Sequence, residues 1–394
     1  MDKHIPTSLL FLILFYTPLS LSFLSPLHQW NCIGFTNNID WSKPYKCNVG
    51  DIPLVVWKNK TDHPIATINI CKHMGSTLHD GWLDNNKCVV CPYHGLKHTH
   101  KDADGCVVEH DGKLWWSMNT QSSPASAASA PSPASAPSLT NSPASPTIPP
   151  TIPYANNKDF HTSYLSFDMD ESLPNCAYNS MDLNHPEYIH NNALGFGSNV
   201  SPQNYKYFDY KNIRDRVGIH FEYYLKKNID TIHYDLNTNN HNSTKNFNMF
   251  IYPFTSWSCV TIGKQRSKMV IGVSMAPLSP EKTRWYVTIR HNYMKDLVGR
   301  NVVKMIARMI LTQDKLQFKR QSMNKRLKKV FMMKKVLEHD EPILRLKEKF
   351  DNEYKYPTID DYLLLNALNK DFENNANYFS GTDFYSTTEE YSTV

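Results

Sequence analysis

The sequence predicts an α+β protein of two domains, a small all-β domain followed by a larger domain that combines an antiparallel sheet with a long helix. The length of 394 residues corresponds to two domains at about 150 residues each, and 41% hydrophobic residues suffice for two cores. Short β-branched runs separated by turns occupy residues 54–116. Five aromatic-rich runs and then a helical pattern occupy residues 217–316.

Residues 1–28 have the composition of a targeting leader. An uninterrupted apolar run covers residues 9–16, and Ser20 and Ser22 stand at the spacing of a cleavage site. Pro18 and the short apolar core argue against a membrane anchor, which is the alternative.

The segment 20–26, SLSFLSP, resembles the cleavage site of bipartite plastid leaders, in which a phenylalanine follows the cut. We therefore expect the protein in a plastid or associated with a membrane.

Residues 29–118 should form the all-β domain, from runs at residues 54–57, 65–70, 87–90 and 112–116. Two of these runs lead directly into pairs of metal-binding side chains. Cys71 and His73 follow the second run, and Cys91 and His94 follow the third. Two thiolates and two imidazoles are the ligand set of a Rieske [2Fe–2S] cluster, in which each ligand type holds one iron.

A zinc ion could use the same four side chains. The spacing, with Gly75 and Gly95 close to the histidines, resembles the Rieske family more closely. Two positions depart from its oxygenase members, because Met74 and Leu96 stand where those have arginine and tryptophan. Neither position is a ligand.

Residues 119–153 are rich in Ser, Ala and Pro and should form a disordered linker. The second domain is expected at residues 154–345, and residues 346–394 are expected to be a C-terminal extension or tail. The five strands predicted for the second domain lie at residues 217–225, 247–254, 256–262, 269–278 and 283–291. The long amphipathic helix is predicted from apolar residues three or four positions apart: Val302, Met305, Ile306, Met309, Ile310 and Leu316.

A second candidate metal site begins at Asn179. Asp182 and His185 share one face of a regular helix, whereas His190 lies about 140° further round. Pro186 cannot donate a hydrogen bond and should distort the helix there, which would bring both imidazoles to one ion. The alternative is that the two histidines are exposed or capping residues near a helix end.

Taken together, these motifs resemble the α subunits of Rieske non-haem iron oxygenases. The family motif N-x-x-D-x-x-H-x-x-x-x-H is matched from Asn179 to His190. The resemblance implies a helix-grip (START-like) catalytic domain in which His185, His190 and a carboxylate of the C-terminal helix hold a mononuclear Fe(II). Asp314 matches that carboxylate, with Asp296 as the alternative.

The resemblance also implies a homotrimer. In such a trimer Asp182 would bridge the iron site of one chain to His73 or His94 of the next and carry electrons between the two centres. The alternative is that Asp182 only stabilises its own helix terminus.

The implied activity is oxygenation of an apolar, ring-containing substrate by O2. The electrons would come from a ferredoxin or an NAD(P)H-dependent reductase, because the sequence has no G-x-G-x-x-G nucleotide motif. The layout is most similar to the group with pheophorbide a oxygenase and chlorophyllide a oxygenase, and aromatic residues such as Trp257, Trp285 and Tyr286 would suit a large flat substrate. Alternatives are a sterol or quaternary-amine oxygenase, or an electron-transfer or redox-sensing protein with a silent second domain.

The net charge of +5 gives no indication of nucleic-acid binding. The basic run at residues 315–335 is either a docking face for an acidic ferredoxin or a solvated helix.

Overall fold

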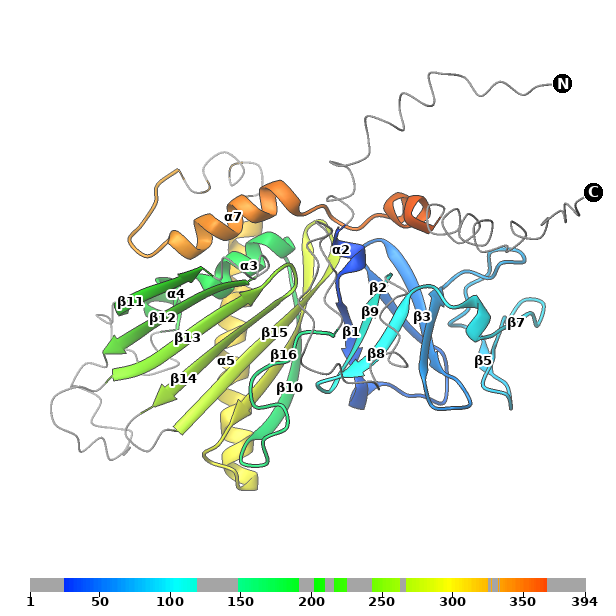
Figure 1. Ribbon diagram of the computed structural model, residues 1–394, viewed down its shortest axis with the longest axis horizontal. Helices are drawn as coiled ribbons and strands as arrows, with labels where there is room; N and C mark the ends of the chain where they lie inside the picture. Colours follow the sequence, from blue (N-terminus) through cyan, green and yellow to red (C-terminus); the bar gives the residue numbers. More distant parts are fainter. Residues whose placement is uncertain are drawn as a thin grey trace, which may run out of the picture.

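The computed structural model of the chain describes residues 25–118, 148–190, 202–209, 216–224, 243–262, 267–324, 327, 332 and 334–366. Two domains lie side by side (Figure 1), and the larger contains one continuous sheet whereas the smaller contains three small ones. The expected combination of an all-β domain with an antiparallel α+β domain is therefore observed.

The first domain pairs its strands in the orders β1-β9-β8, β2-β3-β4 and β5-β6-β7. Its strands β3 and β9 carry the centre of the core, because Leu54, Val56 and Trp116 are fully buried there. The elements are α2 (Ser25–His28), β1 (Asn31–Phe35), η2 (Thr36–Asn38), β2 (Tyr45–Val49), β3 (Ile52–Lys58), β4 (Pro64–Ile68), β5 (Trp82–Leu83), β6 (Val89–Val90), β7 (Lys97–His98), η3 (His100–Asp102), β8 (Cys106–His110) and β9 (Lys113–Ser117).

The second domain is a seven-stranded antiparallel sheet in the order β10-β16-β15-β14-β13-β12-β11. The five predicted strands are present, and β10 and β11 add two that the sequence pattern did not reveal. The elements are β10 (His161–Met169), α3 (Leu173–Met181), α4 (His185–Ile189), β11 (Pro202–Asp209), β12 (Arg216–Tyr224), β13 (Ser243–Ile251), β14 (Thr255–Ile262), β15 (Ser267–Ser279), β16 (Lys282–His291), α5 (Leu297–Ser322) and α7 (Glu341–Glu353).

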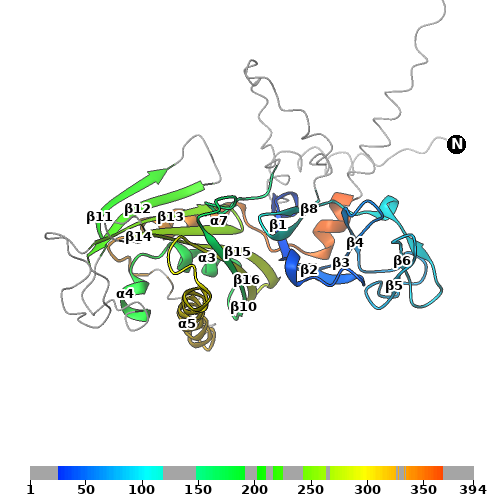
Figure 2. The same ribbon diagram turned by 90° about the horizontal axis from the view of Figure 1, so that it is seen from below.

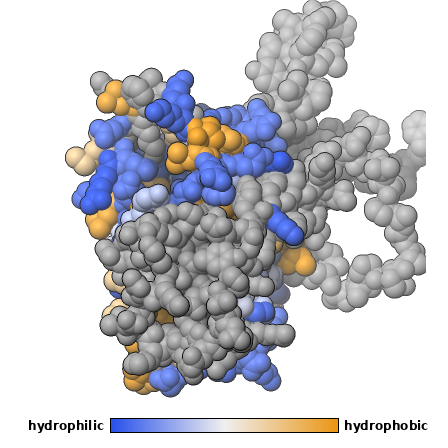
Figure 3. Space-filling view, turned by 90° about the vertical axis from the view of Figure 1, so that its left-hand side faces the viewer, coloured by the Kyte–Doolittle hydropathy of each residue, from blue (hydrophilic) through white to orange (hydrophobic). Residues whose placement is uncertain are grey.

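Helices α4 and α5 lie on the same side of this sheet (Figure 2), and the first domain lies beside its β10 end. At the opposite end, where β11 forms the edge, the described surface is largely hydrophilic with a compact hydrophobic patch near the top (Figure 3). Strand β1 packs against β15 and β16, and Phe35 contacts Tyr286 edge-on at 5.3 Å between ring centroids.

The long helix was predicted at the right place, but the face chosen for its core was wrong. Met305, Met309 and Leu316 are exposed to solvent; 63% of Met305 is accessible. The buried face of α5 consists of Gly299, Val303, Ala307, Leu311, Asp314 and Phe318. The helix carries two apolar series, and only the one with small residues allows the close approach that the sheet requires.

Both ends of the domains differ from the expected boundaries. Residues 25–28, assigned to the leader, form α2, and Leu27 is buried in the core of the first domain. Ile152, assigned to the linker, is fully buried against Gly272 of β15. Residues 1–24 and 119–147 lie outside the described residues, and within the described part of the chain no helix has the length and apolarity needed to cross a bilayer.

The expected C-terminal tail is in part a strap across both domains. Helix α7 packs on α3, where Tyr178 contacts Phe350 edge-on. The chain then crosses to the first domain, where Tyr356 donates a hydrogen bond to Asp51 and Tyr362 is buried in the core. Residues 367–394 lie outside the described residues.

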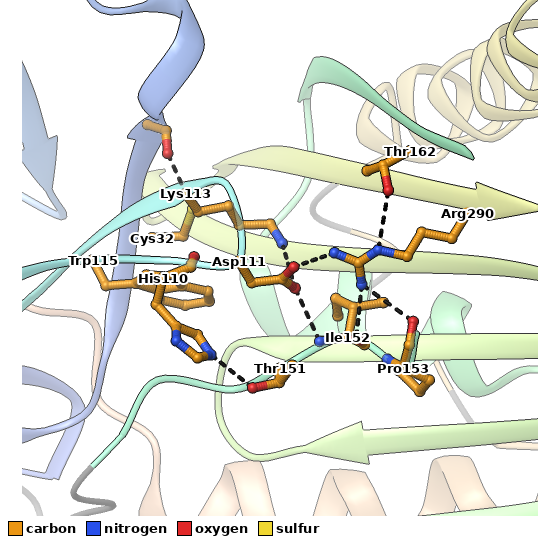
Figure 4. Close-up of polar contacts among 11 residues, drawn as sticks. Cys32, His110, Asp111, Lys113, Trp115, Thr151, Ile152, Pro153, Thr162 and Arg290 are labelled. Atoms are coloured by element: carbon orange, nitrogen blue, oxygen red, sulfur yellow. Dashed lines mark hydrogen bonds and ion pairs between the residues drawn. The ribbon is translucent and has the colours of Figure 1, made fainter. Parts of the chain in front are cut away.

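A buried ion pair joins the two domains (Figure 4). Arg290 of β16 pairs with Asp111, in the turn between β8 and β9, and both side chains are almost completely inaccessible. The same guanidinium donates to the carbonyl oxygens of Ile152 at 2.6 Å and Pro153 at 3.2 Å. The Lys113 ammonium lies 3.8 Å from Asp111, and burial lowers the pKa of this lysine although Asp111 acts in the opposite direction.

Replacing Arg290 by methionine should lower the free energy of unfolding in urea by about 3–5 kcal/mol, because it leaves the Asp111 carboxylate buried without its main partner. Arg284→Met is the matched control on the same strand. Arg284 pairs with Asp168, but both side chains are more than a third exposed, so the expected loss is only about 0–1 kcal/mol. Equal losses in the two variants would contradict this account of the interface.

Candidate metal centres

The four predicted cluster ligands lie in two loops with nearly identical backbone geometry. In the first loop the Cys71 N–H donates to Ser76 at 2.7 Å and Gly75 donates back to the Cys71 carbonyl at 2.9 Å. In the second loop Cys91 and Gly95 make the same two bonds at 2.9 and 3.0 Å, the first of them to Leu96. Both glycines have φ near +75°, a conformation that favours glycine, so the short return of each loop depends on them.

The loops bring like ligands together. Cys71 and Cys91 are buried within hydrogen-bonding distance of each other, whereas His73 and His94 are exposed with ring centroids 4.7 Å apart. Burial raises the pKa of Cys91, but the N–H groups of Tyr93 and His94, together with Cys71 and Ser76, bring it below its ordinary value. A thiol pair inside and an imidazole pair outside fits a cluster with two differently ligated irons better than a single zinc ion.

Large exposed apolar side chains lie in the two cluster loops or directly beside them, and together they are termed the apolar rim. The rim consists of Ile70, Met74, Trp82, Tyr93 and Leu96, all of which are solvent-exposed. Exposed groups of large apolar residues of this kind mark surfaces that contact another protein. The two unusual positions, Met74 and Leu96, both belong to this rim.

The second candidate site is formed where a helix stops and restarts. The expected distorted helix is in fact two helices, because α3 ends at Met181 and α4 begins at His185. Between them the Asp182 carboxylate accepts hydrogen bonds from the N–H groups of Asn184 at 2.8 Å and His185 at 3.2 Å. Pro186 then stands in the first turn of α4, where it is tolerated, so the break lies before the proline.

This break brings His185 and His190 to the buried face of α5. Their ligand atoms and a carboxylate oxygen of Asp314 all lie within 4.8 Å of one another, the one such group of three or more His, Cys, Asp or Glu side chains found among the described residues. The Asp314 Oδ1 lies 3.3 Å from His190 Nε2 and 3.7 Å from His185 Nε2. Donors bound about 2.1 Å from one ion lie at most about 4.2 Å apart, so both pairs fit a single ion.

Neighbouring groups fix the orientation of both imidazoles. His185 Nδ1 donates to the carbonyl oxygen of Asp182 at 3.0 Å, and His190 Nδ1 donates to Gln313 Oε1 at 2.9 Å. Since both partners are oxygen acceptors, each Nδ1 carries a proton, and Nε2, on the Asp314 side, is the nitrogen left to bind a cation. Gln313 had not been singled out from the sequence, because only the α5 backbone reveals that it reaches His190.

The Asp314 carboxylate is only 4% exposed, and Asn179 is 3.4 Å from it as a further donor. Burial lowers the pKa of His190, but the hydrogen bond and charge of Asp314, with Gln313, raise it above its ordinary value. A buried carboxylate between two imidazoles is compensated best by a cation. Asp296 does not belong to this site, because it caps the start of α5 through Gly299 and lies about 27 Å along the helix from Asp314.

The two metal centres lie at opposite ends of the molecule. The cluster loops follow β4 and β6 in the first domain, close to β5 and β7, whereas α4 lies under the far part of the large sheet (Figures 1 and 2). Between the domains lies a cavity of about 360 Å3, lined in part by Tyr45, Arg284 and Lys315. None of the metal-binding side chains lines this cavity, so it is separate from both centres.

Comparison with known proteins directly supports the assignment of the first domain as a Rieske domain. Residues 29–113 match the family of the Rieske [2Fe-2S] domain. Two proteins of Rhodococcus rhodochrous, each described as a 3-ketosteroid-9-alpha-monooxygenase, oxygenase component, are 31% and 29% identical over 65 residues, which is 16% of this chain. The matched part covers only 17% and 16% of those relatives' length.

Solved structures match almost the whole chain. Dicamba monooxygenase bound to dicamba is 15% identical with a TM-score of 0.63, over 86% of this chain and 98% of that chain. NdmA of Pseudomonas putida CBB5 is 14% identical with a TM-score of 0.60, over 84% and 91%. A dicamba monooxygenase structure with non-heme iron and dicamba gives 0.61 at 14% identity, over 88% and 99%. These likenesses confirm the expected fold, a Rieske domain followed by a helix-grip domain.

The cluster assignment is tested by His73→Cys. A third thiolate should shift the electron paramagnetic spectrum toward that of a four-thiolate cluster, or abolish the cluster. His100→Cys is the control, because this exposed histidine of η3 lies outside both loops. An unchanged Rieske spectrum in His73→Cys would show that the ligand set is wrong.

The second centre is tested by Asp314→Ala. This variant should keep the cluster spectrum and lose about one iron per chain together with all oxygenation, because the facial triad loses its carboxylate. Asp296→Ala removes a cap at the other end of the same helix and should retain that iron. The opposite result, loss with Asp296→Ala and retention with Asp314→Ala, would reverse the choice of ligand.

Proposed function

We propose that this chain, in which a Rieske [2Fe-2S] domain precedes a domain with the fold of Rieske non-haem iron oxygenase α subunits, is an oxygenase that acts on an apolar substrate with O2 and externally supplied electrons. The observation that carries the proposal is the convergence of His185, His190 and Asp314 on one point in a chain that also holds the cluster loops. Neither centre alone would indicate an oxygenase.

The donor set of two imidazoles and one carboxylate suits non-haem Fe(II) and also occurs in zinc hydrolases. The accompanying cluster favours iron, because a one-electron carrier serves no purpose for zinc, which has no redox chemistry. When bound, the cluster and the Fe(II) supply the electron storage and the activation of O2.

The chain's own residues prepare the second centre for this chemistry. Gln313 and the Asp182 carbonyl hold the two imidazoles with Nε2 directed inward. The Asp314 carboxylate supplies one negative charge in a buried environment, and three protein donors leave coordination positions open for O2 and substrate. The surrounding core, including Leu311 and Phe318, excludes bulk water from this side of α5.

The two centres of one chain lie at its opposite ends (Figure 1), which supports electron delivery from a second copy of the chain. We therefore propose a homotrimer with head-to-tail contacts, in which the exposed pair His73 and His94 of one chain approaches Asp182 of the next. The Asp182 side chain is 26% exposed and its Oδ2 lies 3.7 Å from His185 Nδ1. The apolar rim of the cluster loops would be buried in this contact.

The electron donor would be a ferredoxin or an NAD(P)H-dependent reductase. This follows from the absence of a dinucleotide motif in the sequence and agrees with the description of the Rhodococcus relatives as oxygenase components. The exposed basic residues Lys319 and Arg320 of α5 belong to the run that could receive an acidic ferredoxin.

The substrate is proposed to be an apolar ring compound. The dicamba monooxygenase structure holds dicamba, and a 3-ketosteroid monooxygenase oxygenase component is among the relatives, whereas the layout suggested a pigment. Trp285, one of the aromatic residues considered for the pocket, is 2% exposed and packs edge-on against Phe318, so it belongs to the core. Phe221, Tyr223 and Tyr224 have side chains outside the described residues.

The function is tested by single turnover under 18O2. The chemically reduced protein is mixed with a panel of chlorophyll-type pigments, sterols, aromatic acids and quaternary amines. We expect 18O in the product of one class, with the cluster oxidised at the same rate. Cluster oxidation without 18O incorporation into any class would favour the alternative, an electron-transfer or redox-sensing protein.

For the compartment, we propose a plastid reached through a leader, with membrane association as the alternative. The support is the composition of residues 1–28, of which residues 1–24 lie outside the described residues. A fluorescent fusion of residues 1–40 should enter plastids; export from the cell, or diffuse cytosolic fluorescence, would remove the proposal.

The bridging role is tested by Asp182→Asn. The amide can retain the bonds from Asn184 and His185 through its oxygen, but it cannot carry the charge that couples the two centres. We expect both metals and a normally reducible cluster, with turnover reduced by about a hundredfold, the upper end of the loss found when a group behind a metal ligand is removed. Turnover near the wild-type rate, or an active monomer in solution, would contradict it.

A further inference from the structure

Asn248 of β13 points into the interior of the second domain. It lies directly opposite Ile219 on β12 and Ser258 on β14, Ser258 lies opposite Ile271, and Ile271 lies opposite Ile289. Residues directly opposite one another in antiparallel strands share one face of the sheet. Ile219 and Ile289 are fully buried in the same core cluster as the inner residues of α5, so Asn248 faces the α5 side.

The proposed iron site faces the same interior. Asp314 belongs to the buried face of α5, between Leu311 and Phe318. Helix α3, which leads into α4, packs on β13, β14 and β15 from this side. In Figure 2 both α4 and α5 lie beneath the sheet, and β13 is among the strands above them. Asn248 and the metal-binding side chains therefore face the same interior, Asn248 from the sheet and Asp314 from α5.

The amide oxygen of Asn248 is buried without a hydrogen-bond donor. The residue is 7% exposed, and its Oδ1 has no hydrogen-bond donor among the residues that the structure describes. Buried side-chain oxygens in native proteins are nearly always hydrogen-bonded, because the hydrogen bond to water that is lost on burial must be replaced. An apolar residue of similar size, such as leucine, would fill the same position without this cost.

The neighbouring Asn246 provides a comparison for the unpaired oxygen of Asn248. It is two residues away on the same strand, so it shares the inner face, and it is 4% exposed. Unlike Asn248, it is engaged in an interaction with other residues. Of these two buried asparagines on one face, Asn248 is the one whose Oδ1 lacks a donor.

We propose that Asn248 is a substrate-binding residue whose Oδ1 accepts a hydrogen bond from an O–H or N–H group of the substrate. This rests on the proposed oxygenase function and narrows its substrate class to an apolar ring compound with one hydroxyl or amine donor. The donor binds at β13 while the carbon to be oxidised lies toward His185, His190 and Asp314. A site with an unpaired acceptor selects against analogues that lack the donor, because they leave the acceptor buried and unsatisfied.

Stability measurements on the full metal-loaded protein separate a ligand-binding role from a structural one. Without ligand, Asn248→Leu should raise the melting temperature or leave it unchanged, because it removes an unsatisfied buried oxygen. Asn246→Leu, the matched control, should lower it by several degrees, on the order of what one lost buried interaction causes. A melting temperature lowered as much by Asn248→Leu as by Asn246→Leu would show that Asn248 is structural, and would overturn the proposal.

Binding is measured with two probe pairs that differ by one hydroxyl, 2-naphthol with naphthalene and cholesterol with 5-cholestene. The wild type should bind the hydroxylated member of at least one pair about tenfold more tightly, and Asn248→Leu should remove that preference without loss of iron or cluster. If neither pair shows a preference, or if the preference persists in Asn248→Leu, the proposal is wrong. Failure of the oxygenase function itself would appear differently, as absence of the third iron and of 18O incorporation in the wild type.

Discussion

The structure of the second domain depends on one buried carboxylate. The series of α5 residues that packs on the sheet runs through Val303, Ala307 and Leu311, and the next position toward the core is Asp314. A charge at such a position is strongly unfavourable unless a cation compensates it. The imidazoles of His185 and His190 reach the same point because α3 stops early and α4 restarts. The helix, the break and the carboxylate together place three side chains that could hold one metal ion.

A second constraint fixes where this site stands relative to the cluster. The buried pair of Arg290 and Asp111 joins the first domain to β16, and the C-terminal strap through Tyr356 and Tyr362 joins them again. Two separate attachments hold the domains in one arrangement, with the cluster loops at one end and α4 at the other. This arrangement keeps the two centres of one chain apart and is the basis for proposing that electrons pass between copies of the chain.

The sequence predicted what is local and missed what depends on packing. The cluster ligands could be found because each pair lies within one short loop, and the strands because their β-branched and aromatic runs are long. The core face of α5 could not be chosen, since Met305 and Met309 form an apolar series as good as the true one, with Val303 and Ala307. The contact of Gln313 with His190 and the pairing of Arg290 with Asp111 join residues that lie far apart in the sequence. The hydrogen-bonding state of Asn248 belongs to the same class.

The metal content of the purified, oxidised chain tests the assignment of the two centres most directly. Iron, zinc and acid-labile sulfide are measured per chain, together with the electron paramagnetic spectrum of the reduced protein. We expect about three irons and two sulfides per chain, from one [2Fe–2S] cluster and one mononuclear site, and a Rieske-type spectrum. A count of two irons with no metal at His185, His190 and Asp314, or zinc in that place, would contradict the assignment of an oxygenase.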